Sequence, residues 1–187
     1  MMKKMLLFVF FCGILLAGPG CFFGGSAPET QVFDLAETAG KKMDLPCAVH
    51  FLFFRNLSGS DRRFLLRMPD GRVVSAEFSR WLLDPELMLE RFLRDRIRGE
   101  GPSQIRIRGV INRFEMDLKR HKALLAVDFE LRTDDRTVLF PCRSEKDFGA
   151  GPFTAAAAAK AMGECAEETA LQLGGHIRAF AAKKPEE

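Results

Sequence analysis

The chain has 187 residues, of which 47% are hydrophobic and 28% are charged. This length and composition fit one folded domain with a substantial core, and they exclude a wholly disordered chain. The formal net charge is +3, and without Lys3 and Lys4 the chain has 26 basic and 25 acidic residues, so charge gives no reason to expect nucleic acid as a partner.

The N-terminus has the three parts of an export signal. Two lysines precede an uncharged apolar run of 13 residues, Met5 to Ala17, and a membrane-spanning helix needs about 20 apolar residues. The small residues before Cys21 resemble a lipobox, although Gly18 stands where leucine is usual. We predict a signal peptide over 1–20 and lipidation of Cys21. There are two alternatives: plain secretion with a free Cys21 in place of lipidation, and a buried N-terminal helix in place of a signal peptide.

The rest of the chain divides into a tether, one domain and a short tail. Residues 21–29 contain Gly-Gly-Ser-Ala-Pro, a composition typical of flexible tethers. We assign residues 30–182 to a single domain and residues 183–187 to a charged tail. A tether this short would hold the domain close to the membrane that carries the lipid.

The first half of the domain is predicted to be mainly strands. Pro69-Asp70-Gly71 has the composition of a tight turn between two of them. The expected strands cover 31–35, 47–55, 63–68 and 72–75, with a loop over 36–45.

A helix is predicted to begin at Asp84-Pro85, where aspartate can cap free amides and proline suits the first helical position. Its apolar stripe is formed by Leu89, Phe92, Leu93 and Ile97. We expect this helix to end at the glycines around residues 99–101.

Alternating apolar residues then predict three long strands, over 105–118, 125–131 and 138–142. The alternation slips by one residue after Ile111, and a β-bulge near Asn112-Arg113 would keep the apolar side chains on one face. A final helix over 154–182 is predicted from the stripe Met162, Ala166, Thr169, Leu173, Ile177 and Phe180. The predicted fold class is α+β, an antiparallel sheet with two helices packed on one face.

Residues that could carry chemistry are few and scattered. Of the cysteines, Cys47, Cys142 and Cys165 would remain in the mature domain beside Cys21, enough for at most one internal disulfide. No cysteine or histidine spacing suits zinc, so we expect no metal and no cofactor. His50, His121 and His176 fall in different predicted elements, and Asp134-Asp135 fits a hairpin turn better than a catalytic pair. We therefore predict no catalytic residues.

Two features suggest surfaces for a partner or a membrane. Trp81, the only tryptophan, either seats the first helix on the sheet or contacts a partner. Arg106 and Arg108 are the members of a larger basic group that we select as contact residues, against lipid phosphates or a partner. An ordinary surface with ion pairs is the alternative. The group consists of Arg91, Arg94, Arg96, Arg98, Arg106 and Arg108.

Several short segments together resemble the ABC-type transport auxiliary lipoproteins, the PqiC-like family. They are Phe33-Asp34-Leu35, Arg63 to Arg67, Gly71 to Val74, and Glu77 to Trp81 leading into Pro85. The resemblance covers residues 30 to 182. It implies a non-enzymatic outer-membrane lipoprotein that faces the periplasm and assists an ABC transporter and an MCE-domain protein in lipid transport. Phe22 agrees with this sorting, because aspartate after the lipidated cysteine is the usual inner-membrane retention signal.

The leading hypothesis is therefore an auxiliary or docking component of an MCE-type ABC lipid transport system. Its expected partners are an MCE-domain protein and the membrane, reached through the lipid anchor, and a homo-oligomer is left open. The alternative is a periplasmic lipid-binding carrier, which would need an apolar cavity for an acyl chain.

Overall fold

The computed structural model describes residues 28–35, 40 and 42–182. The predicted signal peptide 1–20, Cys21 with most of its tether, and the tail 183–187 lie outside the described residues. The elements are β1 (Gln31–Phe33), β2 (Met43–Leu45), β3 (Ala48–Asn56), β4 (Arg63–Arg67), β5 (Val73–Trp81), α2 (Pro85–Arg96), β6 (Ile97–Gly99), β7 (Gln104–Asp117), β8 (Lys122–Arg132), β9 (Thr137–Asp147) and α3 (Ala155–Ala182).

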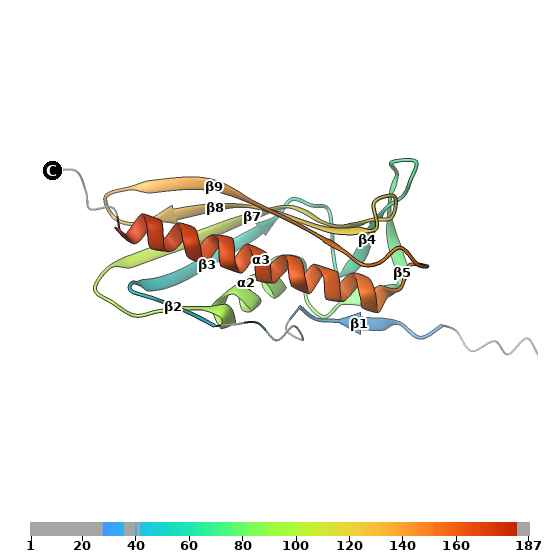
Figure 1. Cartoon of the computed structure of the whole chain (residues 1–187), viewed down its shortest axis with the longest axis horizontal. Helices are drawn as coiled ribbons and strands as arrows, with labels where there is room; N and C mark the ends of the chain where they lie inside the picture. The colour runs from blue at the N-terminus through green and yellow to red at the C-terminus, as the bar shows by residue number, and fades with distance from the viewer. Residues whose placement is uncertain (1–27, 36–39, 41, 183–187) are drawn as a thin grey trace, which may run out of the picture.

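Both described helices lie on one face of an elongated sheet (Figure 1). The long helix α3 packs across β8 and β9, and α2 lies beside it against β3. The described chain begins at one end of the long axis, beside β1, and α3 ends at the other. Neither described helix combines the length and the apolar character needed to cross a membrane. The α+β class and the position of the helices are confirmed.

The sheet is mixed, so the prediction of an antiparallel sheet is wrong in part. Its main order is β1-β5-β4-β7-β8-β9, and β3 also pairs with β7. One edge of β7 is shared, because β3 pairs in parallel with its first half and β4 pairs in parallel with its second. The chain passes through β4, β5 and α2 between β3 and β7, and this crossover lets the two strands run in the same direction. Alternation within each strand carries no information about that direction.

A second, two-stranded sheet pairs β2 with β6 in parallel. Met43–Leu45 was expected to be loop, and Ile97–Gly99 was expected to belong to the first helix. The helix ends at Arg96 instead, and Ile97 turns into the core with an exposed fraction of 3%. Tertiary pairing between two short segments overrides the helical pattern here.

The helix starts follow the sequence only in part. Pro85 occupies the first turn of α2 as expected, but the Asp84 side chain makes no capping hydrogen bond. Asp84 instead forms an ion pair with Arg62, with nitrogen and oxygen 3.6 Å apart. In α3, the amide of Ala157 donates to the hydroxyl of Thr154, which caps that helix.

The core lies between the sheet and the helices. The predicted bulge is present, because the β7–β8 register shifts between Ile111 and Arg113, and Phe114 is buried on the inner face. Every residue of the two predicted helical stripes is buried. The turn at Pro69-Asp70-Gly71 is also confirmed, with Gly71 at a φ of 88°, where glycine avoids the strain of a side chain.

Candidate functional site

The three histidines occupy separate positions in the fold. His50, on β3, pairs with the side chain of Gln104 at 2.8 Å. His121 lies in the β7–β8 turn, and His176 on α3 stacks on Phe140 with ring centroids 3.9 Å apart. Within the described part of the chain, no group of three or more His, Cys, Asp or Glu side chains is placed to hold a metal ion.

The described cysteines are buried free thiols. Cys47, Cys142 and Cys165 form no disulfide and have exposed fractions of at most 1%. Burial raises the pKa of Cys165 to about 12 and that of Cys142 to about 11, from the usual 9.0. Since the thiolate is the reactive form, these side chains act as apolar core groups rather than as nucleophiles.

The acidic pair at Asp134-Asp135 belongs to the turn between β8 and β9. The backbone amide of Thr133 donates to the carbonyl of Arg136, which closes this turn. Asp134 is largely exposed and forms an ion pair with Arg106, with nitrogen and oxygen 2.5 Å apart. The geometry agrees with a hairpin turn.

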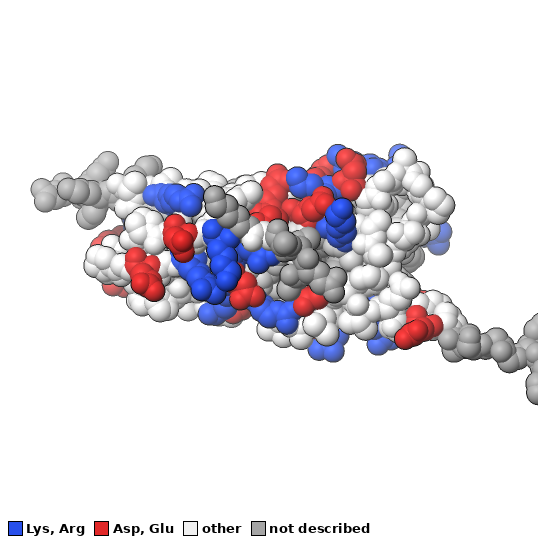
Figure 2. All heavy atoms as spheres, turned by 60° about the horizontal axis from the view of Figure 1, so that its bottom comes forward, with Lys and Arg blue, Asp and Glu red and all other residues white. Residues whose placement is uncertain are grey.

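The predicted group of six arginines is divided by the sheet. Four of its members lie on α2 and β6, on the helical side, whereas Arg106 and Arg108 point outward from β7. Five of the six form ion pairs: Arg91–Asp34, Arg94–Glu90, Arg96–Glu167, Arg106–Asp134 and Arg108–Glu130. On the face seen in Figure 2, basic side chains likewise lie beside acidic ones. The group is therefore not one basic surface.

Trp81 is a core residue, with an exposed fraction of 2%. Its ring stacks on Phe64 at 4.1 Å between centroids and meets Phe114 edge-on at 5.1 Å. The predicted contact role for Trp81 is therefore corrected, because a buried ring does not reach a partner. The other predicted role, in which Trp81 packs inside the domain to seat the first helix on the sheet, fits this packing.

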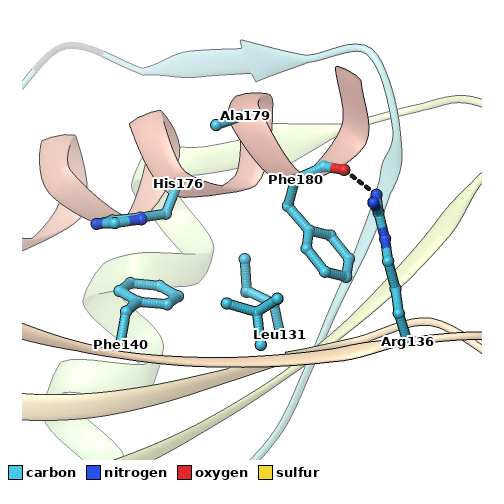
Figure 3. Close-up of a pocket in the computed structure, with 7 residues that line it drawn as sticks. Leu131, Arg136, Phe140, His176, Ala179 and Phe180 are labelled. Atoms are coloured by element: carbon cyan, nitrogen blue, oxygen red, sulfur yellow. Dashed lines mark hydrogen bonds between the residues drawn. The ribbon is translucent and has the colours of Figure 1, made fainter. Parts of the chain in front are cut away.

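One pocket lies at the end of α3, beneath the last turn of that helix (Figure 3). Its volume is about 160 Å³. His176 and Phe140 form one wall and Phe180 the other. The guanidinium of Arg136 donates to the carbonyl oxygen of Phe180 and lies over the Phe180 ring, 4.0 Å from its centroid. Because this arginine is already engaged, the pocket offers mainly apolar contact.

A second hollow of about 240 Å³ lies on the open face of the sheet, opposite the helices. We call it the open-face groove, and it is lined by Phe53, Arg55, Arg108, Val110, Asp128, Glu130 and Leu139 together with the backbone of β7 and β8. Phe53 and Leu139 have exposed fractions of 56% and 73%. The guanidinium of Arg108 lies over the Phe53 ring, 5.2 Å from its centroid.

The groove brings together one predicted site residue and several that the sequence reasoning missed. Arg108 lines it, and Arg106 projects from the same strand on the same face. Phe53 and Leu139 fall in predicted strands but were not selected as contact residues. The run Val138-Leu139-Phe140 held a usable signal, since consecutive strand residues cannot all face inward. Apolar side chains surrounded by charged ones are typical of a protein interface.

The chain matches no family model and no curated protein. Among solved structures, a protein described as uncharacterized superposes with a TM-score of 0.63 at 10% identity, over 80% of this chain and 99% of its own. A protein of the family DUF330 from Xanthomonas campestris superposes with a TM-score of 0.56 at 16% identity, over 82% of this chain and 94% of its own. The chain shares the fold of a DUF330 protein.

This likeness supports the PqiC-like resemblance at the level of the fold. Identities of 10% and 16% do not carry a function from one chain to another, because one fold can serve unrelated functions. The function must therefore be argued from the surfaces of this chain.

Proposed function

We propose that this protein is a non-enzymatic lipoprotein, anchored through Cys21 to the outer membrane and facing the periplasm. It acts there as a docking component of an MCE-type ABC lipid transport system. The open-face groove receives the partner, an MCE-domain protein. The energy for transport comes from the ATPase of the system and not from this chain.

The exposed apolar side chains of the groove carry this proposal. Leu139 and Phe53 flank a hollow on a face that neither helix covers. Arg108, Asp128 and Glu130 surround them with charges of both signs. Such an apolar centre with a polar rim suits a partner of defined shape and charge.

The alternative, a lipid carrier, is less well supported. The two pockets described above have volumes of about 160 and 240 Å³, and both are partly open to solvent. Ligand pockets usually enclose roughly 300–1,000 Å³. The space between sheet and helices is occupied by side chains such as Phe129, Met162 and Leu173, each completely buried.

Substituting Leu139→Glu tests the docking surface. A carboxylate at this position would lie beside Glu130, its register partner on β8, and the substitution would remove the most exposed apolar contact of the groove. We expect the full-length variant to be processed and localised normally but to lose crosslinking to the MCE-domain partner in cell envelopes. Arg108→Glu should also weaken crosslinking, in a salt-dependent way.

Leu171→Glu is the matched control, because Leu171 is 54% exposed on α3, away from the groove. This variant should crosslink like wild type at equal abundance. Normal crosslinking and envelope integrity in Leu139→Glu would contradict the proposed docking surface. A bound phospholipid found by native mass spectrometry would favour the carrier instead.

A further inference from the structure

A second exposed apolar surface lies at the opposite end of the molecule from the α3 pocket, on β1 and β5. Four apolar side chains there have large exposed fractions: Val32 57%, Val73 44%, Phe78 39% and Val74 36%. Arg72 and Arg80 lie among them and are also exposed. We call these six residues the anchor-end patch.

Strand pairing explains the outward direction of two members of the patch, Val32 and Arg80. Val73 and Val74 are consecutive on β5, beside the β4–β5 turn, and point to opposite sides of that strand. Val32 of β1 is the register partner of Arg80 on β5, so the two residues share a face. Phe78 lies two residues before Arg80, in the part of β5 where the register against β4 shifts, and its side chain is 39% exposed. The neighbouring pair, Phe33 and Trp81, points inward instead, where both rings contact Phe64.

The inner face fixes these strands firmly. Trp81 is buried between Phe64 and Phe114, which belong to β4 and β7. The outer side chains of β1 and of the Trp81 end of β5 therefore lie on a well-packed inner layer. Burying them inward would require the aromatic stack on the other face to come apart.

The position of the patch in the chain indicates its partner. Val32 is 11 residues after Cys21, and 11 extended residues span at most about 40 Å. Among the described strands, β1 is the first after that cysteine, and it lies at one end of the long axis together with the β4–β5 hairpin (Figure 1). The proposed lipid on Cys21 is thus attached to the domain through β1, and this attachment favours this end of the domain over the end of α3 as the one next to the bilayer.

The composition of the patch also suits a bilayer surface. Valine and phenylalanine side chains insert among headgroups and acyl chains, and arginine pairs with lipid phosphates. Arg72 already pairs with Asp70 at 2.7 Å, but its side chain remains 73% exposed. A small patch of this kind adds contact to a lipid anchor, whereas a stable protein interface needs roughly 800 Å² from each partner.

We propose that the anchor-end patch rests on the phospholipid headgroups of the membrane that holds the lipid anchor. This inference rests on the proposed lipidation of Cys21. It sets the orientation of the domain: β1 and the β4–β5 hairpin contact the membrane, and the β8–β9 turn with the end of α3 points away from it. The open-face groove is then held at the side of the domain, free for a protein partner.

Tryptophan fluorescence on vesicles tests the contact. Phe78→Trp is made in the full-length chain, and the processed lipidated protein is bound to phosphatidylethanolamine–phosphatidylglycerol vesicles that contain brominated phosphatidylcholine. Trp81 stays in place as a constant background, because it is only 2% exposed. We expect the emission of the new tryptophan to shift to the blue and to be quenched by the brominated lipid.

Leu139→Trp is the matched control at the open-face groove, where the residue is 73% exposed. It should show neither shift nor quenching. Adding Arg80→Glu to Phe78→Trp should reduce the quenching, most strongly on the vesicles with anionic lipid.

Each other outcome has a definite meaning. A Phe78→Trp protein that carries the acyl mass and floats with the vesicles, yet is not quenched, overturns the inference and leaves the proposed lipoprotein function standing. A chain without acyl mass that fails to float overturns the lipoprotein function itself. A blue shift without vesicles that grows with protein concentration identifies the patch as a contact between copies of the chain, which also overturns the inference.

Discussion

At the residue scale, Trp81 shows how burial decides between two roles. Its sequence context, just before the predicted helix at Asp84-Pro85, suited either packing or contact with a partner. In the fold it joins β5 to β4 and β7 through Phe64 and Phe114. Position in the sequence indicates that a tryptophan matters, but only the neighbours that the fold supplies show why.

Phe129 offers a test of the core. Its side chain is fully buried and contacts Phe54 edge-on, with centroids 6.0 Å apart, and stacks on Phe140. Phe129→Asp should unfold the domain, because an isolated buried charge costs several kcal/mol or more. Thermal melts followed by circular dichroism measure this loss of folded structure. A melt like that of wild type would contradict the packing of sheet and helices described here.

The buried thiols predict a pH dependence of stability. Cys142 and Cys165 keep their protons in the folded state because burial raises their pKa to about 11 and about 12, whereas in the unfolded chain they ionise near 9.0. The two protonated thiols therefore contribute fully to the free energy of unfolding below pH 9. This contribution is lost as the pH rises from 9 through 11 and 12. Urea unfolding across that range should show falling stability.

The matched control is the double variant Cys142→Ala and Cys165→Ala, which lacks both titrating groups. Its stability should fall less steeply between pH 9 and 11, even if it starts lower because of the lost volume. Equal slopes in the two proteins would show that other groups cause the decline. In wild type below pH 8, alkylating reagents should leave both thiols unmodified until the chain unfolds.

At the element scale, two glycines test close contact against helix propensity. A Cβ at Gly99 in β6 would overlap the backbone carbonyl oxygen of Cys47, whereas nothing lies within 4 Å of a Cβ at Gly175 in α3. Gly99→Ala should therefore cost about 1–3 kcal/mol. Gly175→Ala should stabilise the domain by about 0.5–1 kcal/mol, because alanine favours a helix over glycine.

Chemical denaturation measures the free energy of unfolding of each variant. We expect it to fall in Gly99→Ala and to rise in Gly175→Ala. Because each change adds a single methyl group, the comparison separates the effect of location from that of size. If Gly99→Ala were as stable as wild type, the close approach of β6 to the segment before β3 would be contradicted.

At the scale of the whole molecule, the two ends of the domain differ. The anchor-end patch lies beside β1, where the described chain begins, and the α3 pocket lies at the other end. The open-face groove lies on the side of the sheet that the helices leave uncovered. An adaptor needs this separation, because the surface held by the membrane cannot also receive a partner.

The proposed membrane anchor is tested by Cys21→Ala. The pattern of two lysines, a 13-residue apolar run and small residues before Cys21 predicts cleavage at that cysteine and its lipidation. The variant should carry no acyl mass, its signal should remain uncut or be cut elsewhere, and it should leave the outer-membrane fraction. Intact-mass spectrometry of the purified protein gives the readout. Mature wild type that begins at another residue and lacks acyl mass would contradict the lipoprotein hypothesis.

The sequence by itself determined the local structure of this protein. Period-two alternation located β7 and β8, and the slip after Ile111 located the bulge, because each side chain's direction follows from its position along one strand. The stripe from Met162 to Phe180 gave α3 and its buried face for the same reason. Two features could not be predicted in this way. Asp84 does not cap α2 because it pairs with Arg62, and Ile97–Gly99 forms a strand because it pairs with β2.

The tertiary structure decided everything that depends on which segments meet. Parallel pairing of β3 and β4 with one edge of β7 leaves no trace in either strand's pattern, since alternation is the same in both directions. Whether an apolar strand residue is core or surface depends on whether a helix covers that face. Phe54 and Phe140 are therefore buried, while their neighbours Phe53 and Leu139 are exposed on the open face of the sheet.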